Sequence, residues 1–158
     1  MNERAADSGD PLSIQERLYP ELPCFGCGQN NPKGLQLRSY PGDGEVTAVF
    51  QPWPEHDNGL GYLNGGIIST VLDCHSAAAV ILEAERRGWP PLRGAPLPYV
   101  TAGLEVRYLR PSPLHEPSEL RAAVVSAEEA EITAEAELVW QGKVRATATA
   151  HWKRWIPR

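Results

Sequence analysis

The stretch from residue 65 to residue 87 constrains the fold more than any other part of this sequence. It reads GGIISTVLDCHSAAAVILEAERR, contains no proline, and has its only two glycines at its first two positions. Gly88 follows it, and the segment Trp89-Pro90-Pro91 prevents a helix from continuing. The stretch therefore predicts one long helix, and no second stretch of comparable length has this pattern.

The rest of the chain favours strands, because after residue 98 apolar residues recur at every second position. Upstream of the helix, a Pro-Gly-Asp-Gly turn at 41–44 joins two further strand-like runs, and Gln141-Gly142 forms a tight turn between the last two strands. The predicted strands are Leu35–Ser39, Glu45–Gln51, Val100–Arg110, Leu120–Val125, Ile132–Trp140 and Lys143–Lys153.

One long helix and about six strands predict an α+β architecture. The economical arrangement is a curved antiparallel sheet wrapped around the central helix, and the free edges of such a sheet favour dimerisation. At 158 residues the chain corresponds to one domain. We expect residues 1–23 to form a flexible tail with a short helix over 13–19, which Ser13 and Glu16 cap, and residues 24–155 to form the domain.

Composition argues against several classes of protein. Fifteen Lys and Arg against 20 Asp and Glu leave a net charge of −5, which disfavours nucleic-acid binding. No run of 18 apolar residues predicts a membrane span, and the polar start MNERAADSGDP lacks a leader pattern. Three cysteines cannot all form disulfides with one another. We therefore expect a cytoplasmic protein that binds neither membrane nor nucleic acid.

The candidate chemistry lies on the predicted helix. Asp73 is a mid-helix carboxylate among small residues, which suggests a cleft or a subunit interface, although a surface aspartate would fit the same pattern. The pair Gly65-Gly66 opens this helix, where free N–H groups can polarise a carbonyl; a glycine pair alone is also compatible with a simple tight turn. A polarised carbonyl and a carboxylate two turns away are the minimum for acyl transfer to water.

These residues resemble a known family. In the hotdog-fold acyl-CoA thioesterases of the phenylacetate-pathway (PaaI) type, an Asn is followed six residues later by His-Gly-Gly, and an Asp stands eight residues after the first Gly. Asn58, Asn64, Gly65 and Asp73 keep these spacings, and YLRP at 108–111 looks like the family's strand that ends in proline. The resemblance covers about residues 24–152, and CFGCG with NPKGL near its start resembles a subset of such proteins.

The resemblance implies a hotdog homodimer, or a dimer of dimers (a homotetramer), with the active site at the subunit interface. It implies hydrolysis of an acyl-CoA thioester to the free acid and coenzyme A, without a cofactor. Asp73 is then the general base or nucleophile, the Gly65 N–H polarises the carbonyl, and Asn58 positions the thioester or the water. The further expected substrate contacts are Asn64, Gly66, Ser76, His56, Arg107 and Arg110.

One departure from the family pattern keeps other functions open. The family's His before the glycine pair is Asn64 here, and Asn cannot exchange a proton near neutral pH. The alternatives are a non-catalytic hotdog protein that binds acyl-CoA or another small ligand, and a hotdog dehydratase or hydratase.

The cysteines and His75 are interpreted as structural residues. Cys24 and Cys27 form a C-x-x-C pair, but a zinc site needs four ligands. Cys74 and His56 could complete such a site only if the fold happened to place them beside the pair. We therefore predict no metal site. His75 occupies an apolar helical position, which predicts a buried histidine bonded to the backbone.

Overall fold

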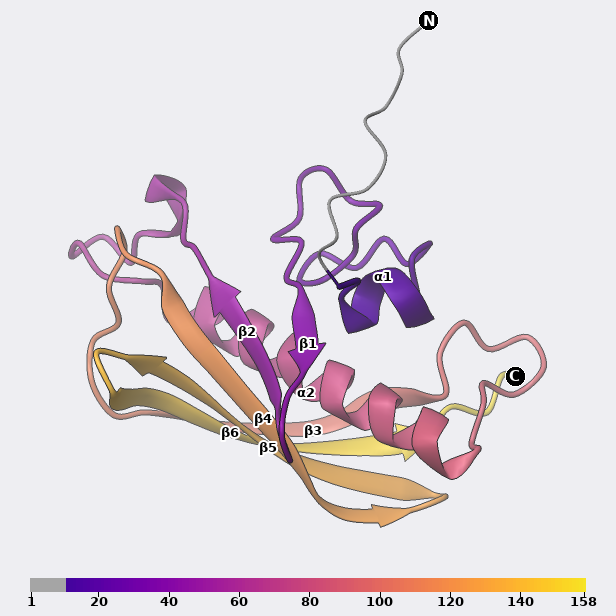
Figure 1. Ribbon diagram of the computed structural model, residues 1–158. Helices are drawn as coiled ribbons and strands as arrows, with labels where there is room; N and C mark the ends of the chain where they lie inside the picture. The colour runs from indigo at the N-terminus through magenta and orange to yellow at the C-terminus, as the bar shows by residue number, and fades with distance from the viewer. Residues whose placement is uncertain (1–10) are drawn as a thin grey trace, which may run out of the picture.

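The computed structural model, which describes residues 11–158, contains the expected elements in the expected order (Figure 1). The long helix α2 spans Gly65–Arg87, as predicted. The predicted tail falls partly on residues 1–10, which lie outside the described residues. The other elements are α1 (Ile14–Leu18), η1 (Pro54–His56), β1 (Ser39–Pro41), β2 (Val46–Phe50), β3 (Tyr99–Tyr108), β4 (Ser118–Glu128), β5 (Glu131–Trp140) and β6 (Lys143–Arg154).

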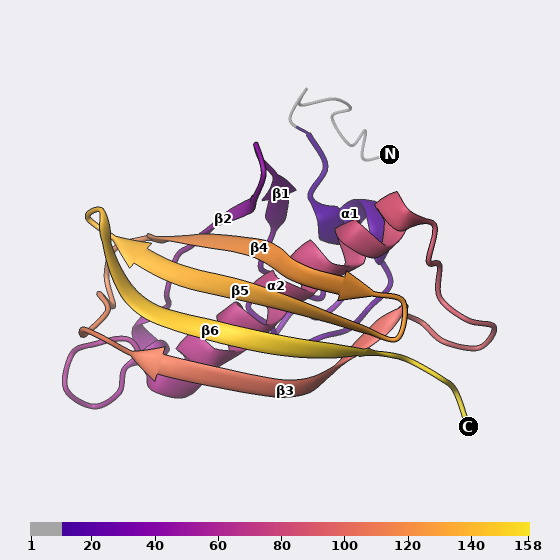
Figure 2. The same ribbon diagram turned by 90° about the horizontal axis from the view of Figure 1, so that it is seen from below.

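The strands form one antiparallel sheet in the order β1-β2-β4-β5-β6-β3. Its long strands curve past one side of α2, so the sheet partly encloses the helix (Figure 2). Strand β3 pairs with β6 rather than with its neighbour in sequence, β4, and this places β3 at a sheet edge. The prediction of a curved antiparallel sheet around one central helix, the hotdog architecture, is confirmed.

Two strands differ from their predicted bounds by three or more residues at one end, and the other four differ by one or two. The first strand begins at Ser39 instead of Leu35, because the main chain at 35–37 bonds to the loop before it: the N–H groups of Leu35 and Leu37 donate to the carbonyls of Phe25 and Gly26 at 2.7 and 3.0 Å. Strand β4 is longer than predicted, because its pairing with β5 shifts register between Val124 and Ser126. Such a bulge breaks the alternation on which the prediction rested.

Helix α2 is the core of the domain. It is long and apolar enough to cross a bilayer by length and composition alone, but 67% of its apolar window is buried inside this fold. The sheet packs on one side, against Ile68, Val71, Ala78 and Leu82, which lie on the face predicted to meet it. The residues before β1 pack on the other side (Figure 1).

Residues 13–23, which we placed outside the domain, therefore belong to its packed body. Helix α1 begins with the expected capping box of Ser13 and Glu16. Its Ile14 and Gln15 are fully buried. The boundary was set too late because a single helical turn has too few residues to reveal a buried face.

A buried polar chain joins this segment to α2. The Gln15 amide nitrogen donates to Ser39 Oγ at 3.1 Å, and Gln15 Oε1 accepts the Ser39 N–H at 2.8 Å. Ser39 Oγ lies 2.8 Å from His75 Nδ1, and the second ring nitrogen of His75 lies 3.0 Å from the Val46 carbonyl. The carbonyl can only accept, so Nε2 carries the proton and Nδ1 accepts from Ser39. His75 is therefore buried and bonded to backbone, as predicted.

We expect this arrangement to make the protein less stable as the pH is lowered. Burial lowers the pKa of His75 to about 4, against 6.5 for an exposed histidine. The unfolded chain therefore takes up a proton below pH 6.5 that the folded chain resists down to about pH 4. The free energy of unfolding should fall over this window, by about 3 kcal/mol at its lower end. Urea unfolding between pH 7.5 and pH 4.5 measures it.

The control variants for this experiment are His75→Gln and His115→Gln. His75→Gln should flatten the pH dependence, whatever it costs in absolute stability. His115 is exposed, so His115→Gln should leave the wild-type slope unchanged. Equal slopes in the wild type and His75→Gln would contradict the assignment.

Candidate functional site

The first turn of α2 presents an unused hydrogen-bond donor. Asn64 is the N-cap, and its Oδ1 accepts the N–H groups of Gly66 at 2.8 Å and Ile67 at 3.4 Å. Among residues 11–158, no acceptor bonds to the N–H of Gly65. This N–H lies at the positive end of a long helix, where it can bind a carbonyl oxygen or an anion.

Tyr108 holds this turn in place from β3. Its hydroxyl donates to the Gly65 carbonyl at 2.8 Å and lies 2.7 Å from Ser69 Oγ. The tyrosine ring also lies against Gly65, where an added Cβ would come within 3.3 Å of it. The sheet edge therefore holds Gly65, the residue that carries the free N–H, from its carbonyl side.

Asn58 lies beside the same turn, in a loop organised by side-chain caps. Its Oδ1 accepts the N–H groups of Leu60 at 2.8 Å and Tyr62 at 3.3 Å. Asp57 caps the loop in the same way, through the N–H groups of two glycines. The Asn58 amide nitrogen has no acceptor among residues 11–158, so it can donate to a ligand. A cavity of about 640 Å³ is lined by four of the predicted site residues and by Tyr108; the four are Asn58, Gly65, Gly66 and Arg110.

Asp73 lies in a second, smaller cavity of about 170 Å³. Thr101 of β3 donates its hydroxyl to Asp73 Oδ1 at 3.0 Å. Burial raises the pKa of this carboxyl; the bond from Thr101 acts in the opposite direction, and negative charge on Cys24 raises the pKa further. A carboxylate whose pKa lies closer to neutrality is a better proton acceptor for catalysis.

One copy of the chain does not bring Asp73 and Gly65 into one cavity. Gly65 lines the cavity at the start of α2, and Asp73 lines the other, two turns along the helix. The two-turn spacing of Gly66 and Asp73 predicted that a helix N–H and this carboxylate converge on a substrate bound along one helix face. In one copy of the chain they line separate cavities, because a helix N–H runs along the helix axis while a side chain leaves the helix sideways.

Three further predicted substrate contacts lie outside the cavity of Gly65. His56 is buried, stacks on Trp53 at 4.7 Å between ring centroids, and accepts the Trp53 N–H at 3.0 Å. The Ser76 hydroxyl donates to the Asp73 carbonyl at 2.7 Å and lies 3.3 Å from Trp152 Nε1. The structure does not bring either side chain to the cavity of Gly65. Arg107 is exposed on β3, outside the residues that line it.

The fold brings all three cysteines together, which the sequence had not predicted. Their sulfur atoms lie within 4.8 Å of one another, and Cys24 Sγ lies 3.7 Å from Cys74 Sγ. Cys24 and Cys27 come from the loop after α1, and Cys74 comes from α2 next to Asp73. The missing signal was the contact between these two segments, which no local pattern carries.

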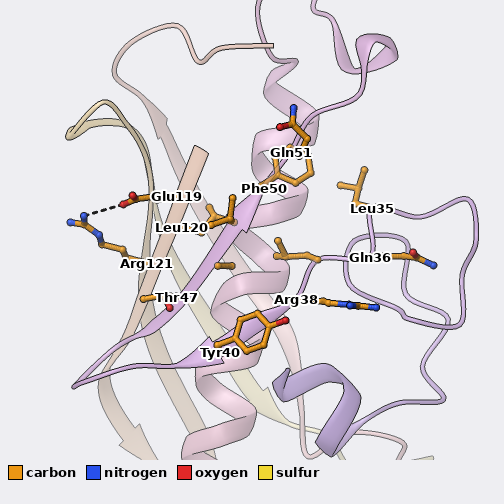
Figure 3. A pocket seen from close by; sticks show the side chains of 13 residues that line it. Leu35, Gln36, Arg38, Tyr40, Thr47, Phe50, Gln51, Glu119, Leu120 and Arg121 are labelled. Carbon is orange, nitrogen blue, oxygen red and sulfur yellow. Dashed lines mark hydrogen bonds and ion pairs between the residues drawn. The ribbon is translucent and has the colours of Figure 1, made fainter. Parts of the chain in front are cut away.

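A further hollow of about 620 Å³ lies between the residues before β1 and strand β2 (Figure 3). Its two arginines already have partners: Arg121 pairs with Glu119 at 3.3 Å, and Arg38 donates to Gln29 at 2.9 Å. Neither Asp73 nor Gly65 lines it. We therefore place the candidate active site elsewhere, at α2.

Comparison with known proteins decides the family. The sequence model of the thioesterase superfamily matches residues 60–142, just over half of the chain and the part that holds α2 and β3–β5. This chain belongs to the thioesterase superfamily. The prediction of a hotdog protein of this superfamily is confirmed, and thioesterase-type chemistry is the function that membership supports. No curated protein matches the sequence.

Solved structures with the same fold include other members of the superfamily. A thioesterase superfamily protein from Shewanella loihica PV-4 is 26% identical, with 76% of this chain and 91% of that chain covered and a TM-score of 0.61. A mutant of the phenylacetic acid degradation protein PaaI from Thermus thermophilus is 24% identical, with 77% and 95% covered and a TM-score of 0.62. The E. coli PaaI protein is 17% identical, with 77% and 81% covered and a TM-score of 0.64. The last two, at these identities, establish the fold alone.

Within this thioesterase fold, two side chains on β3 belong to the site although sequence reasoning missed them. Thr101 bonds to Asp73, and Tyr108 bonds to the Gly65 carbonyl. Both follow from the pairing of β3 with β6 and its contacts with α2. A threonine and a tyrosine on a strand are ordinary strand formers, so their sequence positions carried no separate signal.

Proposed function

We propose that this protein hydrolyses an acyl-CoA thioester to the free acid and coenzyme A. The observation that carries the proposal is the pairing, on one helix, of a free N–H at its first turn with a half-buried carboxyl group further along. The Gly65 N–H has no acceptor among residues 11–158, and burial raises the pKa of Asp73. Few structural needs explain both features together, whereas thioester hydrolysis requires both.

In the proposed reaction, the thioester oxygen accepts a hydrogen bond from the Gly65 N–H. Asp73 takes a proton from a water molecule as its oxygen bonds to the carbonyl carbon. The C–S bond then breaks, and the sulfur leaves with coenzyme A and gains a proton. Direct attack by the Asp73 carboxylate, followed by hydrolysis of the anhydride, uses the same two groups.

We propose further that the site forms between two copies of the chain. Gly65 and Asp73 of one copy line separate cavities, so a second copy is needed to place one beside the other. Strand β3 is an edge strand that pairs only with β6 among the described strands, and its side chains Val100 and Tyr108 are 42% and 53% exposed. Unpaired edges of this kind favour pairing with another chain.

The predicted substrate contacts fit this proposal in part. Arg110 lines the cavity of Gly65, and we assign it to a phosphate of coenzyme A, with Arg107 as a second contact from the exposed face of β3. The free amide of Asn58 is assigned to the thioester or to the attacking water. Asn64 acts through the helix cap rather than by proton transfer, which removes the need for a histidine at this position.

Release of free thiol from a panel of acyl-CoA thioesters tests the proposed function. The panel should contain short, long and aromatic acyl groups, since the acyl class follows from whichever is turned over fastest. We expect turnover of at least one member by the wild type. Saturable binding of acyl-CoA with no thiol release across the panel would contradict hydrolysis and favour a ligand-binding protein instead.

A further inference from the structure

We propose that Cys24, Cys27 and Cys74 form a binding site for a soft divalent cation, with Zn²⁺ as its natural occupant. The chain has three cysteines in 158 residues, and all three meet at one point from two distant segments. Thiolates are the ligands that Zn²⁺ prefers among soft donors. The inference does not depend on the proposed hydrolysis.

The distance between the sulfur atoms fits this ion. In a tetrahedral site with Zn–S bonds of about 2.3 Å, two sulfur atoms lie about 3.8 Å apart. Cys24 Sγ and Cys74 Sγ lie 3.7 Å apart, and all three sulfur atoms lie within 4.8 Å of one another. A site with three thiolates leaves the fourth position open to a water molecule, as in many zinc sites that do not serve structure alone.

Two glycines in the loop make this arrangement possible. A Cβ on Gly26 would overlap the sulfur of Cys74, so only glycine lets the loop approach α2 this closely. A Cβ on Gly28 would collide with the backbone of Cys24, and the Gly28 N–H donates to the Cys24 carbonyl at 2.8 Å. The CFGCG segment is thus a tight turn that points two thiols at a third.

The ionisable groups in the cavity around the cysteines are acidic, which suits a bound cation. Among the described residues that line this cavity there is no Lys, Arg or His, although the cavity holds Asp73 as well as the thiols. One carboxyl group and three thiols therefore share a cavity whose described lining offers no basic side chain.

Tyr19 adds an independent sign of a ligand. Its side chain is 6% exposed and lines the same cavity, and its hydroxyl has no hydrogen-bond partner among residues 11–158. A buried hydroxyl without a partner is costly. A metal-bound water or thiolate beside it would supply an acceptor, as outer-shell partners commonly do in zinc sites.

Binding would replace protons by the ion. Each protonated thiol that joins the site loses its proton to solvent as its sulfur bonds to Zn²⁺, and no electron is transferred. The sequence predicted no metal site because the C-x-x-C pair supplies only two ligands. The third ligand comes from α2 and becomes visible only in the fold.

Metal titration of the full chain tests the proposal directly. The protein is stripped with a chelator and kept reduced and anaerobic, and Co²⁺ is added as a spectroscopic probe before displacement by Zn²⁺. We expect one ion per chain, a thiolate-to-cobalt charge-transfer band, and loss of that band when Zn²⁺ is added. Cys24→Ser, at the partly exposed cysteine, should weaken binding by at least about 100-fold, more than the loss of an outer-shell partner costs.

Two controls keep the result interpretable. Cys27→Ser gives a second measure of the same loss, and circular dichroism verifies that each variant folds. His115→Gln removes an exposed imidazole, a common adventitious ligand, and should leave binding unchanged. The proposal is overturned by the absence of a charge-transfer band when all three thiols are reduced, or by equal binding in the wild type and Cys24→Ser. It is also overturned if the cysteines form a disulfide in air and the reduced protein still rejects the metal.

Discussion

Replacing Asp73 by Asn should lower thiol release by about 10²–10⁴-fold, the usual effect of removing one general base. Asn keeps the shape of the side chain and can still accept the hydrogen bond from the Thr101 hydroxyl, which is 3.0 Å from Asp73 Oδ1. It cannot take a proton or form an acyl intermediate. The loss should appear in kcat rather than in KM, because the carboxylate acts on the reacting atoms and does not hold coenzyme A.

Thr101→Val is the matched control for this prediction. It removes the hydroxyl that bonds to Asp73 and keeps the carboxylate in place. We expect an effect of about tenfold or less, because the general base itself remains. Equal activity of Asp73→Asn and the wild type, with folding intact by urea unfolding, would show that Asp73 is not the catalytic group.

Secondary structure was predictable here because the local patterns are strong. Helix α2 has both of its ends marked, by the cap at Asn64 and by Gly88, whose φ of 74° suits glycine. Strands β5 and β6 alternate apolar and polar residues around the turn at Gln141 and Gly142. The curvature of the sheet around the helix was predictable because the sequence contains only one long helical stretch for the sheet to pack against.

The contacts between distant segments were not predictable in the same way. The burial of Gln15 depends on its bonds to Ser39, on the other side of the CFGCG loop. The meeting of Cys24 with Cys74 depends on how that loop lies on α2. A single sequence records composition and spacing, but it does not record which loop packs against which helix face.

The separation of Gly65 from Asp73 was also not predictable from the sequence. Spacing placed both on one helix and resemblance assigned their roles, but neither revealed that they open into different cavities. The direction of a helix N–H and the direction of a side chain differ, since the N–H runs along the helix axis while the side chain leaves it sideways. That difference is what makes a second copy of the chain necessary to our proposal.

Gly65→Pro should lower thiol release by about 10²–10³-fold, the usual cost of losing one oxyanion donor. Proline removes the N–H and keeps the helix start, because it is well tolerated at the first position of a helix. The preceding residue must be extended, and Asn64 already is, with φ −61° and ψ 134°. Gly65→Ala is the matched control: it adds a side chain against Tyr108 but keeps the N–H, and it should retain most of the activity.

Mixed dimers of Gly65→Pro and Asp73→Asn chains then locate the site. If each site takes its N–H from one chain and its carboxylate from the other, a mixed dimer has one site with both defects and one intact site. Such a dimer, purified through two different tags, should recover about half of the wild-type activity. If both groups acted within one chain, every site would carry a defect, and the mixed dimer would be no more active than its parents. Recovery would therefore place the active site between two subunits, which the separate cavities of one chain require if the proposed reaction is right.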